Sequence, residues 1–400
     1  MPGFEMFGAL ERAEVQDVLD SGVLMRYGFD GMRNGHWKAR ELEQALAARM
    51  NTRFAQTVSS GTAALTVALA SAGVGAGDEV IIPTFTFVAS FEAVLALGAI
   101  PVLTDIDETL CLNPSAVEKA ITERTKAVMP VHMCGSMADL KTLKAICDRH
   151  DLLLIEDACQ AIGGSYEGKP LGSYGDVGCF SFDYVKTITC GEGGGLITDN
   201  ETFYRNADHY SDHGHDHVGS DRGAESHPFL GYNFRISELN AAVGVAQIRR
   251  LDEFLRIQEN HYGILAESLA GLEGITMRKI PVTGVQNYSF LNFFLPSEAL
   301  ARNAHKALAA AGIDGCFYWY DNNWHYYRKW EHLTELKTLG PVSPEVQEKL
   351  SGLKDLTFPS SDHWMGRNLS CLIKLGWSRE EVAQRGEKIK NVLREVLGAA

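Results

Sequence analysis

The chain has 400 residues, of which 45% are hydrophobic and 22% are charged, and its formal net charge at neutral pH is −14. A protein this acidic lacks the basic surface that nucleic-acid phosphates require, so we expect no nucleic-acid partner. The length exceeds that of one small core and predicts a large domain followed by a smaller one.

The N-terminal segment, residues 1–8, has neither a basic region nor a long apolar region, so it does not resemble a secretory signal. The apolar stretch 94–103 is interrupted by Gly98 and Pro101 and is too short to cross a bilayer. We therefore expect a cytoplasmic protein that does not enter a membrane.

The cysteines are scattered, and no Cys-x-x-Cys pair is present. This spacing is not typical of a zinc site or of a disulfide framework, so we expect reduced thiols. The eight residues are Cys111, Cys134, Cys147, Cys159, Cys179, Cys190, Cys316 and Cys371.

Two helical segments, 8–20 and 38–50, flank a loop rich in glycine and arginine. We call residues 21–38 the entry loop. From residue 60 to about residue 200, short β-rich runs alternate with helical runs. Strands are predicted at 80–82, 100–103, 127–131, 152–155, 177–182 and 195–198, and helices at 63–71, 91–97, 114–121 and 137–150.

This alternation predicts an α/β fold with a mainly parallel sheet that helices cover on both faces. Ligands of such folds bind beyond the carboxyl ends of the strands. A long helical segment, 236–269, leads out of this region. We expect a large domain over residues 1–254 and a smaller α+β domain over residues 255–400.

Small residues open the predicted helix at residue 63, in the order Ser60, Gly61, Thr62. Free backbone N–H groups and the helix dipole favour an anion at such a point. Gly61 permits a close backbone approach, and the two hydroxyl groups can donate hydrogen bonds. We favour a phosphate site here, although an ordinary N-cap explains the same residues.

Asp157 ends the largely apolar run 152–157, and Lys186 follows 29 residues later, between an aromatic run and a glycine cluster. Pyridoxal 5′-phosphate (PLP) requires this pair of residue types. A lysine amine forms a Schiff base with the cofactor's aldehyde, and a carboxylate keeps the pyridine nitrogen protonated. The alternatives are a solvated lysine and an aspartate that caps the following segment.

Three further residues are candidates for contacts with the cofactor. Phe87, or Phe85 two residues earlier, has the side chain to stack on the ring, although both also suit a core. Gln160, three residues after Asp157, can reach the phenolic oxygen or the other ring face. Ser181 can donate to the phosphate, or it is a strand serine bonded to the backbone.

Together these stretches resemble the DegT/StrS-type sugar aminotransferases over about residues 10–270. The stretches are Ser60-Gly-Thr, Pro83-Thr-Phe-Thr-Phe, Glu156-Asp-Ala, Ser181 to Lys186, Gly191-Glu-Gly-Gly and Gly231 to Arg235. The resemblance implies the aspartate aminotransferase-like fold (fold type I), PLP as cofactor, and a homodimer with shared active sites.

The resemblance also implies roles for single residues. Lys186 would form the Schiff base and Asp157 would bind the pyridinium nitrogen. Thr62 and Ser181 would bind the phosphate, Phe87 would stack on the ring, and Asn233 would reach the phosphate in the other subunit. A rival within this fold, a PLP-type sugar dehydratase, has histidine in place of the lysine. A homologue without catalysis is a further alternative, which the intact residue set disfavours.

Within the family, the chain most resembles the branch that forms 8-amino-3,8-dideoxy-octulosonate, an amino form of the lipopolysaccharide sugar Kdo. This resemblance implies L-glutamate as amino donor and a C8 aldehyde as acceptor. The resemblance rests on residues 131–137, 190–194, 211–217, 221–227 and 316–320. Cyclitol and aminohydroxybenzoate branches of the family share some of these stretches.

The entry loop is longer and more basic than the family pattern. Arg26 and Arg33, with His36 and Lys38 nearby, can meet the carboxylate of a free sugar acid, because arginine binds carboxylates with two parallel hydrogen bonds. A solvated basic loop is an equally good interpretation.

His213, His215 and His217 alternate along the chain, as metal ligands on a strand would. We expect no metal, because PLP chemistry needs none. Hydrogen bonds from His213 and His215 to substrate hydroxyl groups are the functional interpretation, and a surface loop is the alternative. The aromatic stretch 317–327 suits either a sugar's apolar face or the core of the small domain.

Overall fold

The computed structural model describes residues 2–219 and 222–398. Its central seven-stranded sheet has the order β1-β9-β8-β5-β4-β2-β3. The strands are β1 (Phe54–Val58), β2 (Glu79–Pro83), β3 (Ile100–Thr104), β4 (Thr125–Val128), β5 (Leu153–Asp157), β8 (Val177–Ser181) and β9 (Gly194–Thr198). Only β9 runs opposite to the others in this sheet, because it pairs antiparallel with both β1 and β8. The expected mainly parallel sheet is confirmed.

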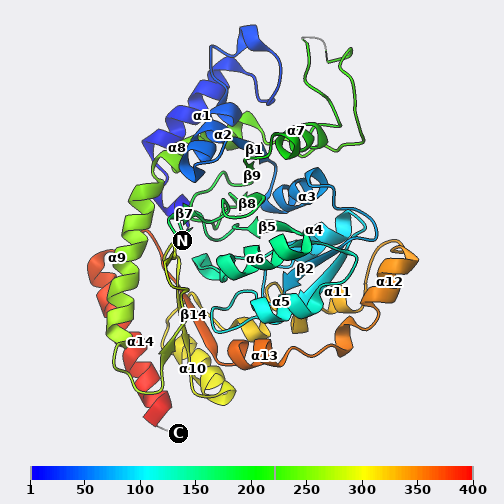
Figure 1. Ribbon diagram of the computed structural model, residues 1–400. Helices are drawn as coiled ribbons and strands as arrows, with labels where there is room; N and C mark the ends of the chain where they lie inside the picture. The colour runs from blue at the N-terminus through cyan, green and yellow to red at the C-terminus, as the bar shows by residue number, and fades with distance from the viewer. Residues whose placement is uncertain (1, 220–221, 399–400) are drawn as a thin grey trace.

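Helices cover both faces of this sheet (Figure 1). Strand side chains alternate between the two faces, so Val80 and Ile82 enter one core cluster with Leu65, while Ile81 enters another with Leu143. The covering helices are α3 (Gly61–Ser71), α4 (Ala89–Ala96), α5 (Pro114–Ala120), α6 (Leu140–His150) and α7 (Glu201–Tyr210).

A separate helical layer packs beside β1. It contains α1 (Ala9–Ser21), α2 (Lys38–Met50) and α8 (Glu238–Arg249). The predicted helix over residues 236–269 is in fact two helices, because the chain leaves helical geometry at Arg250, before α9 (Leu251–Leu269).

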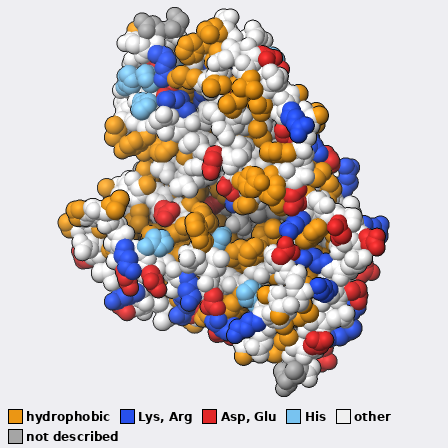
Figure 2. Space-filling view, turned by 180° about the vertical axis from the view of Figure 1, so that it is seen from behind, with side chains coloured by type: hydrophobic (Ala, Val, Ile, Leu, Met, Phe, Trp, Pro, Cys, Tyr) orange, Lys and Arg blue, Asp and Glu red, His pale blue; other side chains and the backbone are white. Residues whose placement is uncertain are grey.

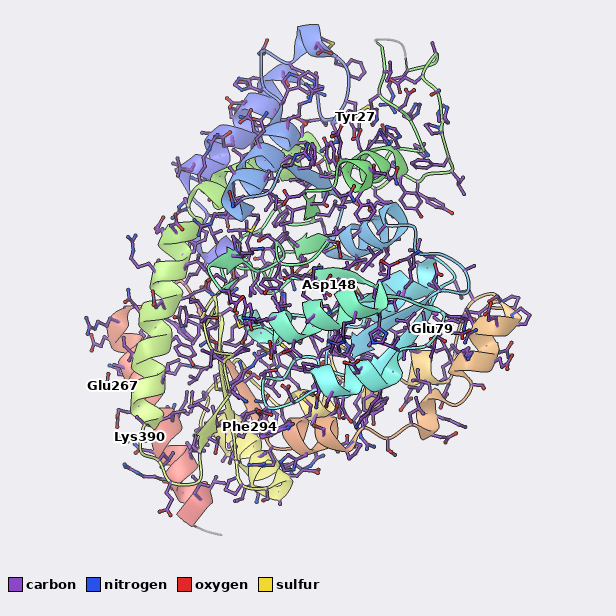
Figure 3. The ribbon with its side chains drawn as sticks, viewed as in Figure 1. Tyr27, Glu79, Asp148, Glu267, Phe294 and Lys390 are labelled. Carbon is purple, nitrogen blue, oxygen red and sulfur yellow. A yellow bond between two sulfur atoms is a disulfide. The ribbon has the colours of Figure 1, made fainter. Side chains whose placement is uncertain are left out.

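Helix α9 leads to a second sheet with the order β10-β12-β14-β13. Figure 3 shows α9 and α14 along one side of the molecule, with Glu267 and Lys390 on them and Phe294 on the sheet. The elements are β10 (Thr276–Met277), β12 (Phe290–Phe294), β13 (Cys316–Phe317), β14 (Asn368–Leu372), α10 (Glu298–Ala310) and α14 (Arg379–Gly398).

The aromatic stretch after β13 does not belong to one core. Tyr318 packs in the cluster around the second sheet, but Tyr326 and Trp330 pack in the same cluster as Phe85 and Phe91 of the large sheet. The chain therefore returns to the large domain at this point. The segment continues through the helices α11 (Glu331–Thr334), α12 (Pro344–Leu350) and α13 (Pro359–Met365).

A third, small sheet connects the two parts of the chain. It joins β11 (Gly284–Val285) to β6 (Ser165–Tyr166) and β7 (Lys169–Pro170).

One expectation about the cysteines is wrong. Cys316 and Cys371 form a disulfide, whereas six cysteines are free thiols. The two residues face each other on the antiparallel strands β13 and β14. They are 55 residues apart in the sequence, so spacing alone did not reveal the pair. Within the described ranges, no helix is long and apolar enough to span a membrane.

Candidate active site

Most of the residues predicted to contact the cofactor meet at one edge of the large sheet. Ser60 follows β1, Phe87 follows β2, Asp157 ends β5, and Ser181 ends β8. Because these strands run parallel, their carboxyl ends share an edge. A cavity of about 260 Å³ lies there, and its lining includes Ser60, Gly61, Thr62, Phe87, Asp157, Gln160, Ser181 and Lys186.

One end of the cavity is the N-terminus of α3. Ser60 caps this helix, because its Oγ accepts a hydrogen bond from the backbone N–H of Ala63 at 3.0 Å. A Cβ atom at Gly61 would lie 2.7 Å from the Cβ of Ser181 and 2.9 Å from its Oγ, so only glycine permits this approach. The exposed Thr62 adds a hydroxyl. Helix N–H groups and hydroxyls are suited to a phosphate.

The other end contains a buried carboxylate. Asp157 is 4% exposed, and its Oδ2 accepts a hydrogen bond from Ser90 Oγ at 2.7 Å. Its Oδ1 accepts one from the backbone N–H of Cys159 at 3.1 Å. Such a carboxylate fits a pyridinium N–H, because an ionised carboxylate accepts several hydrogen bonds.

The structure separates the two phenylalanine alternatives. Phe87 lines the cavity, whereas Phe85 is fully buried in the core. Gln160 also lines the cavity, and its Oε1 accepts a hydrogen bond from the backbone N–H of Cys134 at 2.9 Å. That contact fixes the glutamine side chain beside the cavity.

Lys186 lies in the turn that follows β8. Its backbone N–H donates to Asp183 O at 3.0 Å, and its own carbonyl accepts from the N–H of Gly3 at 2.8 Å. No hydrogen bond or ion pair to its Nζ occurs within the described part of the chain. The amine is therefore free inside a cavity that also contains a polar helix end and a carboxylate, which is the arrangement that PLP needs.

The contact of Gly3 leads to a prediction about stability. A Cβ atom at Gly3 would lie 2.2 Å from Gln247 Oε1 and 2.7 Å from the backbone oxygen of Thr187. We expect Gly3→Val to lower the free energy of unfolding by about 1–3 kcal/mol, because backbone must move. Urea unfolding measures this loss, and Gly75→Ala, which meets nothing within 4 Å, is the control. Equal stability of the two variants would contradict the prediction.

His325 is a cavity residue that the sequence did not indicate. It lies in the aromatic stretch and reaches the site because its backbone carbonyl accepts from the N–H of Thr86 at 3.0 Å. Its ring lies 5.4 Å from that of Phe87. A local sequence motif could not reveal this role, because the turn at Thr86 that positions His325 lies far from it in the sequence.

The hydrogen bonds of His325 define its tautomer. Asn322 Oδ1 accepts from the backbone N–H of Trp324 at 2.9 Å, so it is an oxygen, and it lies 2.9 Å from His325 Nδ1. Nδ1 therefore carries the proton and Nε2 is an acceptor. Burial, with the positive charge of Lys186, lowers the pKa of His325 to about 3, so this acceptor stays neutral.

The entry loop does not bring its arginines to the cavity. Arg26 is buried, forms an ion pair with Glu43 at 2.5 Å and donates to Thr57 Oγ1 at 2.9 Å. Arg33 is also buried, donates to the backbone oxygen of Gly28 at 2.7 Å and lies 3.3 Å from Glu238. These contacts anchor the loop, so the interpretation as a carboxylate site has no support in this chain.

The predicted histidines lie on a projecting segment, residues 211–219 and 222–235, which we call the arm (Figure 1). His213 is exposed and His215 pairs with Glu225 at 2.8 Å. The stretch 221–227 of the resemblance begins at Asp221, which lies outside the described residues. Neither His213 nor His215 lines the cavity of its own chain, and no metal-binding cluster occurs within residues 2–219 and 222–398.

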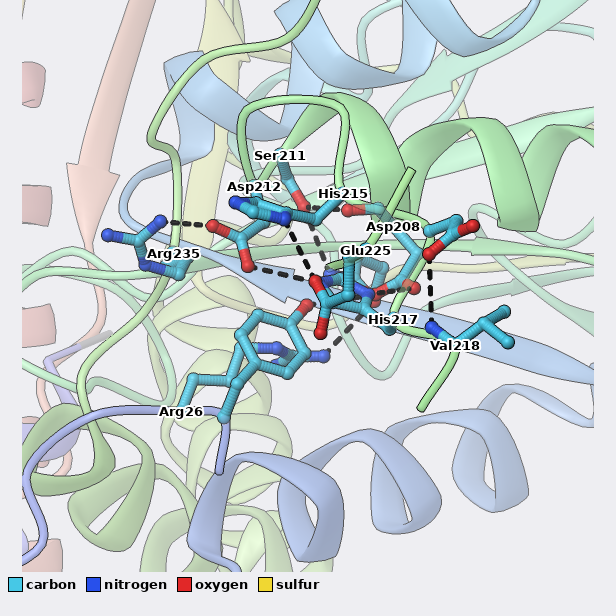
Figure 4. A network of polar contacts seen from close by, with 12 residues as sticks. Arg26, Asp208, Ser211, Asp212, His215, His217, Val218, Glu225 and Arg235 are labelled. Atoms are coloured by element: carbon cyan, nitrogen blue, oxygen red, sulfur yellow. Dashed lines mark hydrogen bonds and ion pairs between the residues drawn. The ribbon is translucent and has the colours of Figure 1, made fainter. Parts of the chain in front are cut away.

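His217 ties the arm to the large domain (Figure 4). Its Nδ1 lies 2.7 Å from Asp208 and its Nε2 lies 2.9 Å from Asp212, which also binds Arg222 and Arg235. Burial opposes the charge on His217, but the two carboxylates outweigh it and raise the pKa to about 9.

This pKa predicts how stability depends on pH. The folded value exceeds the ordinary value of 6.5, so the stabilisation is complete below about pH 6.5 and is lost as the pH rises through about 9. We expect the thermal unfolding midpoint of the wild type to fall over this range more steeply than that of His217→Gln. Parallel curves for the two proteins would contradict this assignment.

Asn233 lies outside the cavity. It is exposed on the arm, between the exposed Tyr232 and the half-buried Phe234, and its Oδ1 accepts from the backbone N–H of Arg235 at 3.3 Å. The carbonyl of the next residue, Phe234, accepts from the N–H of Ser59, but Asn233 itself does not line the cavity of its own chain.

The chain is similar in sequence and in structure to known aminotransferases. Residues 7–376 match the DegT/DnrJ/EryC1/StrS aminotransferase family. GDP-perosamine synthase of Vibrio cholerae is 35% identical over 83% of this chain and 87% of its own length. L-Glutamine:2-deoxy-scyllo-inosose aminotransferase of Streptoalloteichus tenebrarius is 40% identical over 73% of this chain and 70% of its own length. The solved structure of the sugar aminotransferase Spr1654 of Streptococcus pneumoniae, in its PLP form, covers 98% of this chain and 97% of its own. It is 25% identical in sequence and has a TM-score of 0.81. With Lys186 and Asp157 in one cavity, the chain belongs to the DegT/DnrJ/EryC1/StrS aminotransferase family and is a PLP-dependent transaminase.

Proposed function

We propose that the protein transfers an amino group from L-glutamate to a sugar that carries a keto or aldehyde group. The acceptor that we propose is the C8 aldehyde of an oxidised Kdo, in the synthesis of a lipopolysaccharide amino sugar. The placement of Lys186, Asp157 and the N-terminus of α3 around one cavity carries the transaminase part of the proposal. When bound there, PLP supplies an electron sink for the carbanion at the donor's α-carbon.

Each residue then has a proposed role. Lys186 Nζ holds the cofactor covalently at rest, and the free amine later moves the proton of the donor's α-carbon. Asp157 holds the proton on the pyridine nitrogen. Ser60, Gly61, Thr62 and Ser181 bind the phosphate, Phe87 stacks on the ring, and Gln160 and His325 border the ring and the substrate.

The sugar acceptor is supported by the named relatives, one of which is a perosamine synthase. The octulosonate acceptor is supported by the resemblance of stretches such as 131–137 and 316–320 to that branch. A second candidate is a cyclitol acceptor with L-glutamine as donor, because the L-glutamine:2-deoxy-scyllo-inosose aminotransferase named above is 40% identical to this chain. The presence of Lys186 disfavours a dehydratase.

We propose a homodimer in which Asn233 reaches the phosphate in the partner's site. The arm exposes apolar side chains, with Val218 73% and Leu230 75% exposed, and the entry loop exposes Phe29 and Met32. Figure 2 shows apolar side chains gathered in the upper part of the molecule, beside a group of histidine and basic side chains. Such a surface is typical of a contact with another protein. We also propose a boundary near residue 255 between the domains and a cytoplasmic location.

The donor and acceptor are tested with purified protein loaded with PLP. Conversion of the visible absorbance to that of the pyridoxamine form by L-glutamate, but not by L-glutamine, would support the donor. The aminated form would then be mixed with 8-oxo Kdo, a GDP-linked keto sugar or an inosose. Return of the visible band only with the inosose would favour the cyclitol candidate.

The shared site is tested by subunit mixing. Lys186→Ala and Asn233→Ala are each inactive if Asn233 completes the partner's site. A mixed dimer then contains one intact site, and exchange of subunits restores about a quarter of the wild-type activity. No recovery in verified mixed dimers would show that Asn233 acts within its own chain, and an Asn233→Ala protein that is active by itself would show that Asn233 has no role.

A further inference from the structure

Ser90 lines the same cavity, beside the carboxylate that we assign to the pyridine nitrogen. It belongs to the first turn of α4, is fully buried, and donates from Oγ to Asp157 Oδ2 at 2.7 Å. We propose that Ser90 is a positioning residue that orients Asp157 and holds its charge toward the cofactor ring. This inference rests on the proposed role of Asp157.

The direction of the hydrogen bonds follows from the groups present. An ionised carboxylate only accepts, so the single proton of Ser90 points to Asp157. Ser90 Oγ also lies 2.6 Å from Thr86 Oγ1, and it must accept there because its proton is already engaged. Thr86 Oγ1 also lies 3.2 Å from the carbonyl oxygen of Phe87, but the shorter contact takes its proton because Ser90 has none left to give. The hydroxyls therefore form an ordered chain from Thr86 through Ser90 to Asp157.

The carboxylate of Asp157 is held at both oxygens. Ser90 donates to Oδ2, and the backbone N–H of Cys159 donates to Oδ1 at 3.1 Å. Two fixed donors restrict rotation of the carboxylate, and each oxygen keeps a lone pair for another donor. A hydrogen bond to a charged group inside the protein is stronger than one between neutral groups.

The same turn also positions the stacking residue. The N–H of Ser90 donates to Phe87 O at 3.1 Å, so both residues belong to one tight turn after β2. Thr86 is fully buried, and its N–H binds the carbonyl of His325. A single rigid segment, residues 86–90, therefore sets the stacking side chain, the support of Asp157 and the backbone of His325.

The test compares Ser90→Ala and Ser90→Cys with the wild type, all loaded with PLP. Cysteine nearly preserves the volume of serine but is a weak donor, which separates packing from hydrogen bonding. We expect both variants to slow amination by L-glutamate about 10- to 100-fold. We also expect the pH midpoint of the visible band to rise, because a less firmly held proton leaves the ring less positive. Ser90→Thr, which retains a hydroxyl, should recover most of the rate.

A double-mutant cycle with Asp157→Asn tests whether Ser90 acts through Asp157. If it does, Ser90→Ala adds no further effect in the Asp157→Asn background. Ser71→Ala is the matched control, because Ser71 is a buried serine that donates only to the backbone oxygen of Ala68. A merely structural role would lower stability in both serine variants and leave the pH midpoint unchanged.

The outcomes separate this inference from the proposed function. If Asp157→Asn changes the midpoint and the rate but Ser90→Ala changes neither, the inference is overturned and the role of Asp157 stands. A normal Ser90→Cys beside an altered Ser90→Ala would assign the effect to packing and also overturn it. If Asp157→Asn changes nothing, the assignment of Asp157 itself fails.

Discussion

Lys186→Ala is expected to lower the rate of transamination by on the order of 10⁴-fold, because one amine both binds the cofactor and moves the α-proton. No other lysine lines the cavity among the described residues, so no neighbour can replace it. Steady-state assays with L-glutamate and a keto sugar measure the loss. The visible band of the lysine-bound cofactor should also disappear.

The control for this variant is Lys169→Ala. Lys169 is an exposed lysine on β7 that does not line the cavity, so its loss should leave the rate unchanged. Lys186→Arg retains the charge but forms no Schiff base, and it should be as inactive as the alanine variant. A visible band that persists in Lys186→Ala would move the covalent site to another residue and refute the assignment.

The large sheet was predictable where its strands are apolar. The runs around Ile81, Val102 and Ile155 contain consecutive β-branched or aliphatic residues, as buried parallel strands do. Strand β1 was missed because it contains Gln56 and Thr57. Both are fully buried, and contacts with Arg26 make that burial possible, which a local pattern does not reveal.

The site was predictable where residues stand at strand ends, and less so where distant segments meet. Asp157 and Ser181 follow apolar runs, so their positions follow from the parallel sheet. Ser90 and His325 depend on one turn that contacts both β5 and the aromatic stretch. The arginines of the entry loop do not line the cavity, because they pair with Glu43 and Glu238, which lie on the helices α2 and α8 and which no local pattern indicates.

Asp157→Asn is expected to lower the rate of amination by L-glutamate by about 10²–10³-fold, the usual loss when one fixed electrostatic contact is removed. The amide preserves the shape of the side chain but cannot hold a proton on the pyridine nitrogen as a charged partner does. The ring would then withdraw electrons less strongly from the donor's α-carbon. Stopped-flow absorbance of the half-reaction measures this step directly.

The same variant should still bind the cofactor, because Lys186 and the N-terminus of α3 remain intact. Its visible band should therefore persist, with an altered pH dependence, while the rate falls. Asp139→Asn is the matched control, since Asp139 caps α6 and does not line the cavity. That control should unfold slightly more readily and react at the normal rate. If Asp157→Asn lost the cofactor altogether, the carboxylate would act in binding, and its assignment to the electron sink would be wrong.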